Sequence, residues 1–290
     1  MKKFYKRTGW LLGICFTIGF ILIVTGTVMG ARGIIVYSKE SGFEVIDAGD
    51  KWNHTDMDLK EFNSIYIDVD TADINILPSK DGKYGIELSL ISDSEDIQFE
   101  NEDGQLVIKD YSKEDLFTID LFSFWESLDN EITIYVPQDK ELDMINVKAD
   151  TGDLDIQSIK GSKELVITND VGDVDIKETR FEKVNLTLDV GDVNMQKVDI
   201  TDKFYAKMDV GDFDCKGNLY GDIDIVVNVG DVDIKTGVPS SDYKYNVSIN
   251  VGDLDAFGVS DDGFDGELQG NPDGKYTINI TVDVGDVKVE

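Results

Sequence analysis

The sequence is poor in the residues from which nucleophilic active sites, metal centres and disulfide frameworks are built. Its 290 residues include two cysteines, four prolines and one histidine, and the three arginines are Arg7, Arg32 and Arg180. His54 has neither a second histidine nor a cysteine near it in the sequence, so Ser-His-Asp, Cys-His and His-rich sites are not indicated and a surface position is expected. The scarcity of arginine argues against a β-helical enzyme that cleaves acidic polysaccharides with a metal and an arginine or lysine base. We predict no catalytic residues and no cofactor, and therefore no enzyme.

Basic residues are also scarce, with 27 Lys and Arg against 59 Asp and Glu. Residues 1–32 contain five basic residues and no acidic one, which leaves 22 basic and 59 acidic residues and a net charge of 22 − 59 = −37 for the remainder. Such a surface repels nucleic acid and anionic lipid, so no nucleic-acid partner is expected. Because 41% of the residues are apolar and they alternate with polar ones, the composition still indicates folded structure rather than an acidic disordered tail.

The 22 residues from 10 to 31 carry no charge and can span a bilayer core of about 30 Å at about 1.5 Å per residue. Four of the five N-terminal basic residues precede it. The positive-inside rule therefore predicts a cytoplasmic tail at residues 1–9, a transmembrane helix at residues 10–31 and an extracytoplasmic remainder, in a single-pass protein of the cell membrane. An uncleaved signal anchor is favoured over cleavage, and the bulky Ile14 disfavours lipid attachment at Cys15. Cys15 cannot reach Cys215 in this topology, so a domain without disulfides is expected.

A short phrase, Val-Gly-Asp-Val-Asp-Ile, returns throughout the second half of the chain. A period near 20 residues is typical of stacked structural repeats. Between the phrases apolar and polar residues alternate, as in residues 184–190, which indicates strands with one buried face. The repeats are therefore predicted to be the rungs, or single turns, of a β-solenoid. Their glycines, which follow one another at 20, 19, 20, 19, 22 and 33 residues, are Gly152, Gly172, Gly191, Gly211, Gly230, Gly252 and Gly285.

Each phrase is expected to form a corner of its rung. Val190 and Val193 are both apolar but lie three positions apart, so the chain is predicted to turn at Gly191 and Asp192 to bury both. Glycine accepts a positive φ and leaves no side chain in the bend, while an adjacent aspartate can bind backbone amides. Stacking at about 4.8 Å then buries the apolar residues in columns, one of which includes Cys215. The fold predicted for residues 61–290 is an all-β, single-stranded β-solenoid with rungs of about 20 residues.

The repeat is interrupted near its start. Residues 65–76 match a rung with Ala72 at the glycine position, and a strand-rich excursion at about residues 78–144 separates this rung from the next. Within it, residues 111–130 are crowded with Leu, Ile, Phe and Trp. They are interpreted as a cap over the end of the apolar columns, with a loop that contacts a partner or membrane as the alternative. Residues 260–275 are expected to be a glycine-rich loop, and residues 32–60 a juxtamembrane linker.

One known family has the same arrangement. Residues 131–137, Glu-Ile-Thr-Ile-Tyr-Val-Pro, are followed by Ile-Asn-Val at residues 145–147 and then by the Gly-Asp-Val-Asp-Ile rungs. This order resembles the bacterial putative-adhesin family of β-strand-repeat domains of unknown function, over roughly residues 60–290, and the N-terminus is similar to that of membrane-tethered members. The resemblance implies a β-helix on the cell envelope, often of Gram-positive bacteria, in proteins linked to adhesion or envelope stress. It implies no catalytic residues, and it supports a fold more than an activity.

The rungs repeat acidic residues at matched positions, which in-register stacking would turn into ladders of repelling carboxylates about 4.8 Å apart. Ca²⁺ can offset the repulsion by bridging adjacent rungs, because hard cations take carboxylate oxygens. The alternative, in which the corner aspartates accept backbone N–H bonds and the rest are hydrated, is favoured because calcium-repeat and EF-hand motifs are missing. The candidate calcium ladder consists of Asp173, Asp175, Asp189, Asp192, Asp209, Asp212, Asp214, Asp231 and Asp233.

The sequence thus predicts a non-enzymatic, membrane-anchored, extracytoplasmic β-solenoid that presents a rigid acidic surface, as an adhesin or a cell-envelope scaffold. Its expected partners are the membrane, through residues 10–31, and an envelope protein or polysaccharide. The alternative is an accessory or regulatory component of a cell-envelope stress response. That role requires a membrane partner, because the tail at residues 1–9 is too short to be a signalling domain.

Overall fold

A computed structural model describes residues 33–38, 42–47, 52–90, 97–110, 117–119 and 130–290. The chain divides into two compact units, Met1–Lys51 with Lys113–Leu128 and Trp52–Ser112 with Asp129–Glu290. In the first unit, β1 (Gly33–Ser38) pairs antiparallel with β2 (Gly42–Asp47) and with β9 (Phe117–Ile119). The expected tail and transmembrane helix at residues 1–9 and 10–31 lie outside the described residues. Within the described ranges, no helix has the length and apolar character needed to cross a membrane.

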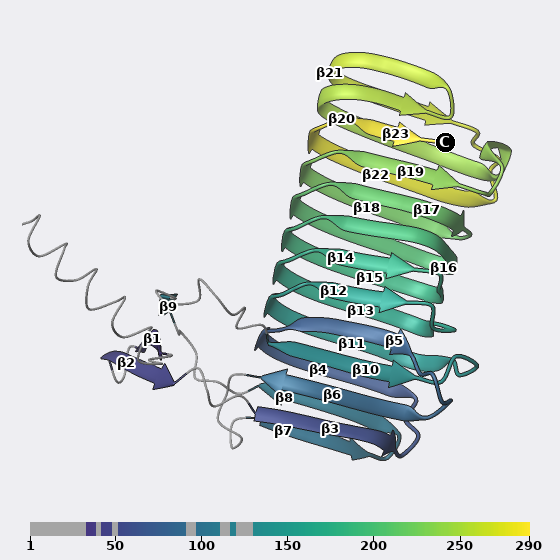
Figure 1. The fold of residues 1–290 in the computed structure, drawn as a ribbon. Helices are drawn as coiled ribbons and strands as arrows, with labels where there is room; N and C mark the ends of the chain where they lie inside the picture. Colours follow the sequence, from purple (N-terminus) through teal and green to yellow (C-terminus); the bar gives the residue numbers. More distant parts are fainter. Residues whose placement is uncertain (1–32, 39–41, 48–51, 91–96, 111–116, 120–129) are drawn as a thin grey trace, which may run out of the picture. The chain divides into compact units, whose positions relative to one another are not determined.

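The second unit is an all-β solenoid, in which strands from successive rungs pair in parallel and in register (Figure 1). One sheet holds the strands before each glycine corner and the other holds the strands after it. The first sheet consists of β4 (Ser64–Thr71), β11 (Leu142–Thr151), β13 (Ser162–Val171), β15 (Arg180–Val190), the end of β16 (Val193–Val210), β18 (Asp222–Val229), β22 (Tyr276–Val284) and the start of β20 (Tyr243–Ala256). The second consists of β5 (Asp73–Pro78), β12 (Leu154–Gln157), β14 (Val174–Lys177), the start of β16, β17 (Phe213–Leu219), β19 (Val232–Thr236), β23 (Val287–Val289) and the end of β20.

The core consists of columns of apolar side chains that run through the stack. In β15, Leu186 and Leu188 are buried while Thr187 between them is only partly covered, which is the period-2 pattern of a strand with one buried face. Leu186 lies between Ile167 and Ala206 of the neighbouring rungs. Each fully buried Val, Leu or Ile contributes about 1.5–3 kcal/mol relative to an exposed one. Since no rung can bury its apolar face alone, neighbouring rungs stabilise one another.

The corners are real, but the reason given for them from the sequence is wrong in one respect. Val193 is 1% exposed whereas Val190 is 46% exposed, so the valine before the glycine faces solvent. The chain turns between Leu188 and Val193, the last buried residue of one sheet and the first of the other. At the corner Gly191 has a φ of 148°, and a Cβ there would lie 2.0 Å from the carbonyl oxygen of Gly172. Only glycine allows the rungs to approach this closely.

The order of the last two rungs in space differs from their order in the sequence. The final rung, β22 and β23, pairs with β18 and β19 on one side and with β20 on the other. The rung of Gly285 therefore lies between those of Gly230 and Gly252. Residues 260–275, expected as a loop, are mostly the strand β21 (Val259–Gly270), which folds back antiparallel on β20. Their sequence is rich in Gly and Asp, and for this reason it did not indicate a strand.

The other end of the stack is covered by the excursion and by part of the expected linker. β8 (Gln105–Asp110) and β7 (Ile97–Glu102) extend the first sheet, while β10 (Glu131–Val136), β6 (Tyr84–Leu90) and β3 (Trp52–Leu59) extend the second. Residues 32–60 thus contain three strands, and the solenoid unit begins at Trp52 rather than at residue 61. Of the segment 111–130 expected as a cap, only β9 and Asn130 are described, and β9 pairs with β1.

His54, for which a surface position was expected, is half-buried against two aromatic rings. Its ring lies 5.6 Å from that of Trp52 and 4.9 Å from that of Phe99, measured between centroids. Its Nε2 is buried and has no hydrogen-bond partner among the described residues. Because Trp52 and Phe99 come from β3 and β7, the outermost strands of the two sheets, the three rings close this end of the apolar columns.

Candidate binding surfaces

The aspartates that follow the corner glycines form a continuous hydrogen-bonded ladder. In each rung the backbone N–H of this aspartate donates to Oδ1 of its counterpart in the preceding rung, at 2.7–3.0 Å. This is the amide-bonded arrangement that the sequence analysis favoured over a calcium ladder. The carboxylates therefore join neighbouring rungs instead of only repelling one another. The ladder runs, in spatial order, through Asp73, Asp153, Asp173, Asp192, Asp212, Asp231, Asp286 and Asp253.

A second acidic column lies two positions before the glycines and is partly neutralised by asparagine. Asn228 donates from Nδ2 to Oδ1 of Asp209 at 3.0 Å, and Asn250 does the same to Asp283 at 2.9 Å. Partial burial, together with the charges of the neighbouring Asp70 and Asp170, raises the pKa of Asp150 above its usual value. The column consists of Asp70, Asp150, Asp170, Asp189, Asp209, Asn228, Asp283 and Asn250.

The third column lies three residues after each glycine, on the outer face of the second sheet. Burial raises the pKa of Asp155, while Asn194 donates to Asp175 at 2.8 Å. Lys288 takes the place of an acid between Asp233 and Asp255. In spatial order the column contains Asn75, Asp155, Asp175, Asn194, Asp214, Asp233, Lys288 and Asp255.

The candidate calcium ligands are thus divided among three columns instead of meeting at one site. Asp173, Asp192, Asp212 and Asp231 belong to the first column, Asp189 and Asp209 to the second, and Asp175, Asp214 and Asp233 to the third. Across the ranges that the structure describes, no group of three or more His, Cys, Asp or Glu side chains is arranged to hold a metal ion. Calcium binding to these residues, the alternative that the sequence favoured less, would require ligands from more than one rung.

A surface that the sequence reasoning missed lies between the first two acidic columns. Six valines directly before the glycines stack in register, and each is 40–47% exposed. The same position holds Thr71 and Thr151 in the first two rungs, so packing does not require valine there. The signal was present as the repeated valine, but it was assigned to the core. This valine stripe consists of Val171, Val190, Val210, Val229, Val284 and Val251.

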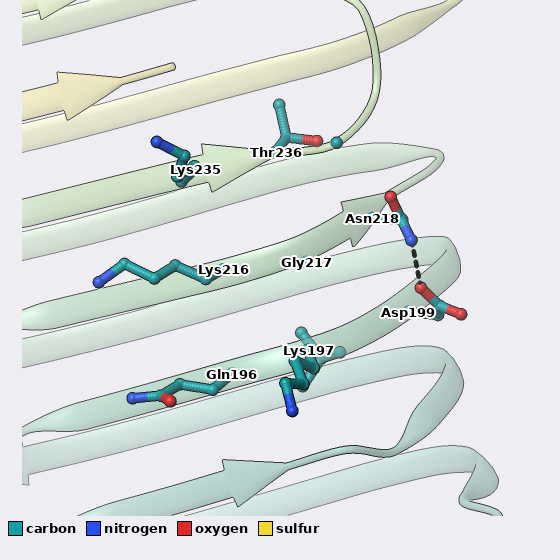
Figure 2. A pocket seen from close by; sticks show the side chains of 10 residues that line it. Gln196, Lys197, Asp199, Lys216, Gly217, Asn218, Lys235 and Thr236 are labelled. Carbon is teal, nitrogen blue, oxygen red and sulfur yellow. Dashed lines mark hydrogen bonds between the residues drawn. The ribbon is translucent and has the colours of Figure 1, made fainter.

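A groove of about 510 Å³ lies across three rungs at the end of the second sheet (Figure 2). Its lining includes Lys197 of β16, Lys216 of β17 and Lys235 of β19. Lys216 and Lys235 are in register, whereas Lys197 leaves the ladder where the register of β16 and β17 shifts, with a φ of 53°. Two glycines line the groove as well, Gly217 and Gly237, where an added Cβ would lie 2.0 Å from the carbonyl oxygen of Val198 and 2.3 Å from Oδ1 of Asn218.

The one described cysteine offers no chemistry. Cys215 is fully buried in β17, in register with Met195 and Ile234. Burial raises the pKa of its thiol to about 12. A thiol held neutral in an apolar column is neither a nucleophile nor a metal ligand, so Cys215 is a core residue.

The fold and its repeated surfaces define a β-solenoid of stacked glycine-cornered rungs. Residues 62–236 and 162–290 match the model of the Toastrack DUF4097 family, and the chain belongs to this family. Among curated proteins, none matches the chain.

Several solved structures are similar. One is a putative adhesin from Bacteroides fragilis, 19% identical over 83% of this chain and 97% of that one, with a TM-score of 0.47. A putative cell adhesion protein from Clostridium sporogenes is 14% identical over 83% and 99%, with a TM-score of 0.40. A putative lipid binding protein from Parabacteroides distasonis is 13% identical over 83% and 98%, with a TM-score of 0.47. None of these three names describes an enzyme.

Proposed function

We propose that this chain is a membrane-anchored, extracytoplasmic adhesin or envelope scaffold, which residues 10–31 hold in the cell membrane and which contacts an envelope protein or polysaccharide through the valine stripe. The observation that carries the proposal is the stripe itself. Six apolar side chains that the fold could replace by threonine are exposed in one line between two acidic columns. Exposed apolar surface that packing does not require is typical of interaction sites.

The rigidity of the stripe supports the same role. The corner aspartates join every rung to the next through backbone amides, so the spacing of the valines is fixed at about 4.8 Å by the stack. A partner that binds along this line does not have to order it first, and the entropic cost of association is lower for a preorganised surface. The flanking carboxylates add hydrogen-bond acceptors on both sides.

The test is sedimentation of the purified full chain with isolated cell envelopes. A double variant, Val190→Thr with Val229→Thr, removes apolar surface from the stripe and keeps β-branching and charge. Its matched control is Val226→Thr with Val259→Thr, two valines outside the stripe. Since a partner that covers a valine gains about 1 kcal/mol from it, replacing two valines costs about 2 kcal/mol, and the stripe variant should bind about thirtyfold more weakly than the control. Equal binding of the two variants, or no binding by the natural chain, would refute the proposal.

The membrane anchor and the accessory role are separated by a second comparison. The full chain should remain with membranes after an alkaline wash, and intact cells should expose residues 52–290 to added protease. Exchange of residues 10–31 for a foreign membrane span should leave envelope binding unchanged if the chain is an adhesin or scaffold. Loss of a co-purifying membrane partner after the exchange would instead favour an accessory component of a stress response.

A further inference from the structure

Of the three lysines that line the groove, two pair with acids and one does not. Lys197 pairs with Glu178 at 2.6 Å and Lys235 with Glu290 at 3.2 Å. Lys216 has no ion-pair or hydrogen-bond partner in the described part of the chain. In a chain with 59 acidic and 27 basic residues, a shortage of acids cannot be the reason.

One acid, Asp199, lines the groove and keeps its charge, because its hydrogen-bond donor is a neutral amide. Oδ1 of Asp199 accepts a hydrogen bond from Nδ2 of Asn218 at 2.7 Å, across two neighbouring rungs (Figure 2). The carboxylates of the third acidic column, Asp214 and Asp233, lie two residues before Lys216 and Lys235 on the same strands, so the two lysines stand between that column and the groove. With three lysines and one aspartate among its lining residues, the groove is more basic than the acidic face beside it.

We propose that this groove binds an oxyanion, a carboxylate or a phosphate, carried on a sparsely charged glycan that runs across the rungs. The ammonium of Lys216 supplies the unpaired charge, and charge-assisted hydrogen bonds from lysine to such groups are among the strong ones. The volume of the groove, about 510 Å³, falls in the range of small-ligand sites and accommodates a short stretch of sugar rather than a whole polymer.

The surrounding charge sets the class of polymer. A dense polyanion such as nucleic acid would place further charges against Asp214 and Asp233 and would be repelled. A glycan with one oxyanion every few sugars can place one charge at Lys216 and neutral hydroxyls over the rest of the groove. This site shares no residue with the valine stripe. It is therefore a second binding site beyond the adhesion proposed above, and it can be tested independently.

The experiment is a calorimetric titration of the purified full chain with three probes. These are an oligogalacturonate, a glycan polymer that carries phosphodiesters, and inorganic phosphate. The substitution Lys216→Gln removes the charge with little risk to the fold, because Gln196 and Gln157 occupy the same column of the second sheet. Lys207→Gln, at an exposed lysine of the first sheet, is the matched control.

We expect at least one of the two polymers to bind, and to bind at least fivefold more weakly to the Lys216→Gln variant. Its affinity should fall as the salt concentration rises from about 50 to about 200 mM, because salt screens the attraction between exposed charges. The Lys207→Gln variant should bind within twofold of the natural chain. The polymer that binds identifies the carboxylate or the phosphate as the group recognised.

Three results would overturn the proposal: no binding of either polymer at millimolar concentration, equal binding by the natural chain and the Lys216→Gln variant, or binding of inorganic phosphate as tight as that of a polymer. Melting temperatures of the variants ensure that lost binding is not lost folding. Sedimentation of the same Lys216→Gln variant with envelopes distinguishes the two proposals. Contact through the valine stripe does not involve Lys216, so the substitution should leave that contact unchanged.

Discussion

Replacing one corner glycine by alanine tests the close approach of the rungs directly. At Gly191 the added Cβ would lie 2.0 Å from the carbonyl oxygen of Gly172, where real Cβ atoms essentially never come closer than 3.0 Å. The two rungs must therefore separate by at least 3.0 − 2.0 = 1.0 Å at this point. That displacement strains the hydrogen bonds between the same two rungs, from the amide of Gly172 to the carbonyl oxygen of Val190 at 2.9 Å and from the amide of Asp192 to Oδ1 of Asp173 at 2.8 Å.

Three costs add up in the Gly191→Ala variant. An alanine held at a φ of 148° costs about 1–3 kcal/mol. Forcing the extra methyl group between two backbones costs about 1–3 kcal/mol, and the loss of a corner hydrogen bond about 1 kcal/mol more. Their sum, about 3–7 kcal/mol, should lower the melting temperature by about 6–28 °C, because 1 kcal/mol corresponds to about 2–4 °C for a unit of this size.

The matched control is Gly82→Ala. Gly82 also has a positive φ, 76°, but an added Cβ there would have no atom within 4 Å, so this variant carries the backbone cost without the clash. Thermal unfolding followed by circular dichroism compares the two variants, and amide exchange should show lost protection in the rungs on either side of Gly191, since each rung depends on its neighbours. If Gly191→Ala were no more destabilising than Gly82→Ala, the corner would tolerate a side chain and the steric argument would fail.

Two further predictions concern the acidic columns. The folded protein holds the pKa of Asp150 above its unfolded value, so the ionised carboxylate disfavours the folded state above that pKa and the penalty disappears as the pH falls through it. We therefore expect Asp150→Asn to raise the melting temperature at pH 7, with a difference from the natural chain that shrinks in acid; a difference that is constant with pH would contradict this. Because the corner aspartates already accept backbone amides, we also expect millimolar Ca²⁺ to leave the melting temperature of the metal-free full chain unchanged. A rise in melting temperature with Ca²⁺ would show that adjacent rungs share the cation.

The rung and its corner could be predicted from the sequence because both are local. Alternation of apolar residues defines a strand within seven positions, and glycine beside aspartate at residues 191 and 192 has few uses other than a tight bend. The side on which Val190 lies was not predictable in this way. A valine three positions from Val193 is equally compatible with a corner that buries it and with one that exposes it, and only the positions of Leu188 and Val193 in the structure decide between the two.

Two residues of the candidate surfaces illustrate a different limit. In the sequence, Lys216 is one of many charged residues that alternate with apolar ones. Its position in a groove depends on the register shift between β16 and β17 and on Gly237 of the next rung, which no local pattern reports. His54 likewise gained partners from Phe99, a residue on another strand. Contacts between rungs are invisible to reasoning that treats each repeat by itself.

The order of the last rungs has a physical reason that the period of 20 residues could not reveal. β21 is antiparallel to β20 and pairs with no other strand among those described, so it can close a parallel stack but cannot continue it. If the rung of Gly252 were stacked directly on that of Gly230, the final rung could pair only with β21, in the antiparallel sense. Placed between them instead, β22 and β23 pair in parallel on both sides.

A hydrogen-bonded turn accompanies the placement of the final rung between the rungs of Gly230 and Gly252. Asn271, in the turn after β21, donates from Nδ2 to the carbonyl oxygen of Ser241, just before β20, at 2.5 Å and to that of Tyr243, the first residue of β20, at 2.9 Å. The turn between β21 and β22 is therefore bound to the start of β20 and to the turn that precedes it. The strand left at the outside, β21, is rich in aspartate and glycine, which disfavours pairing with a second molecule at this edge. The final rung thus lies inside the stack, and the strand rich in aspartate and glycine lies at its end.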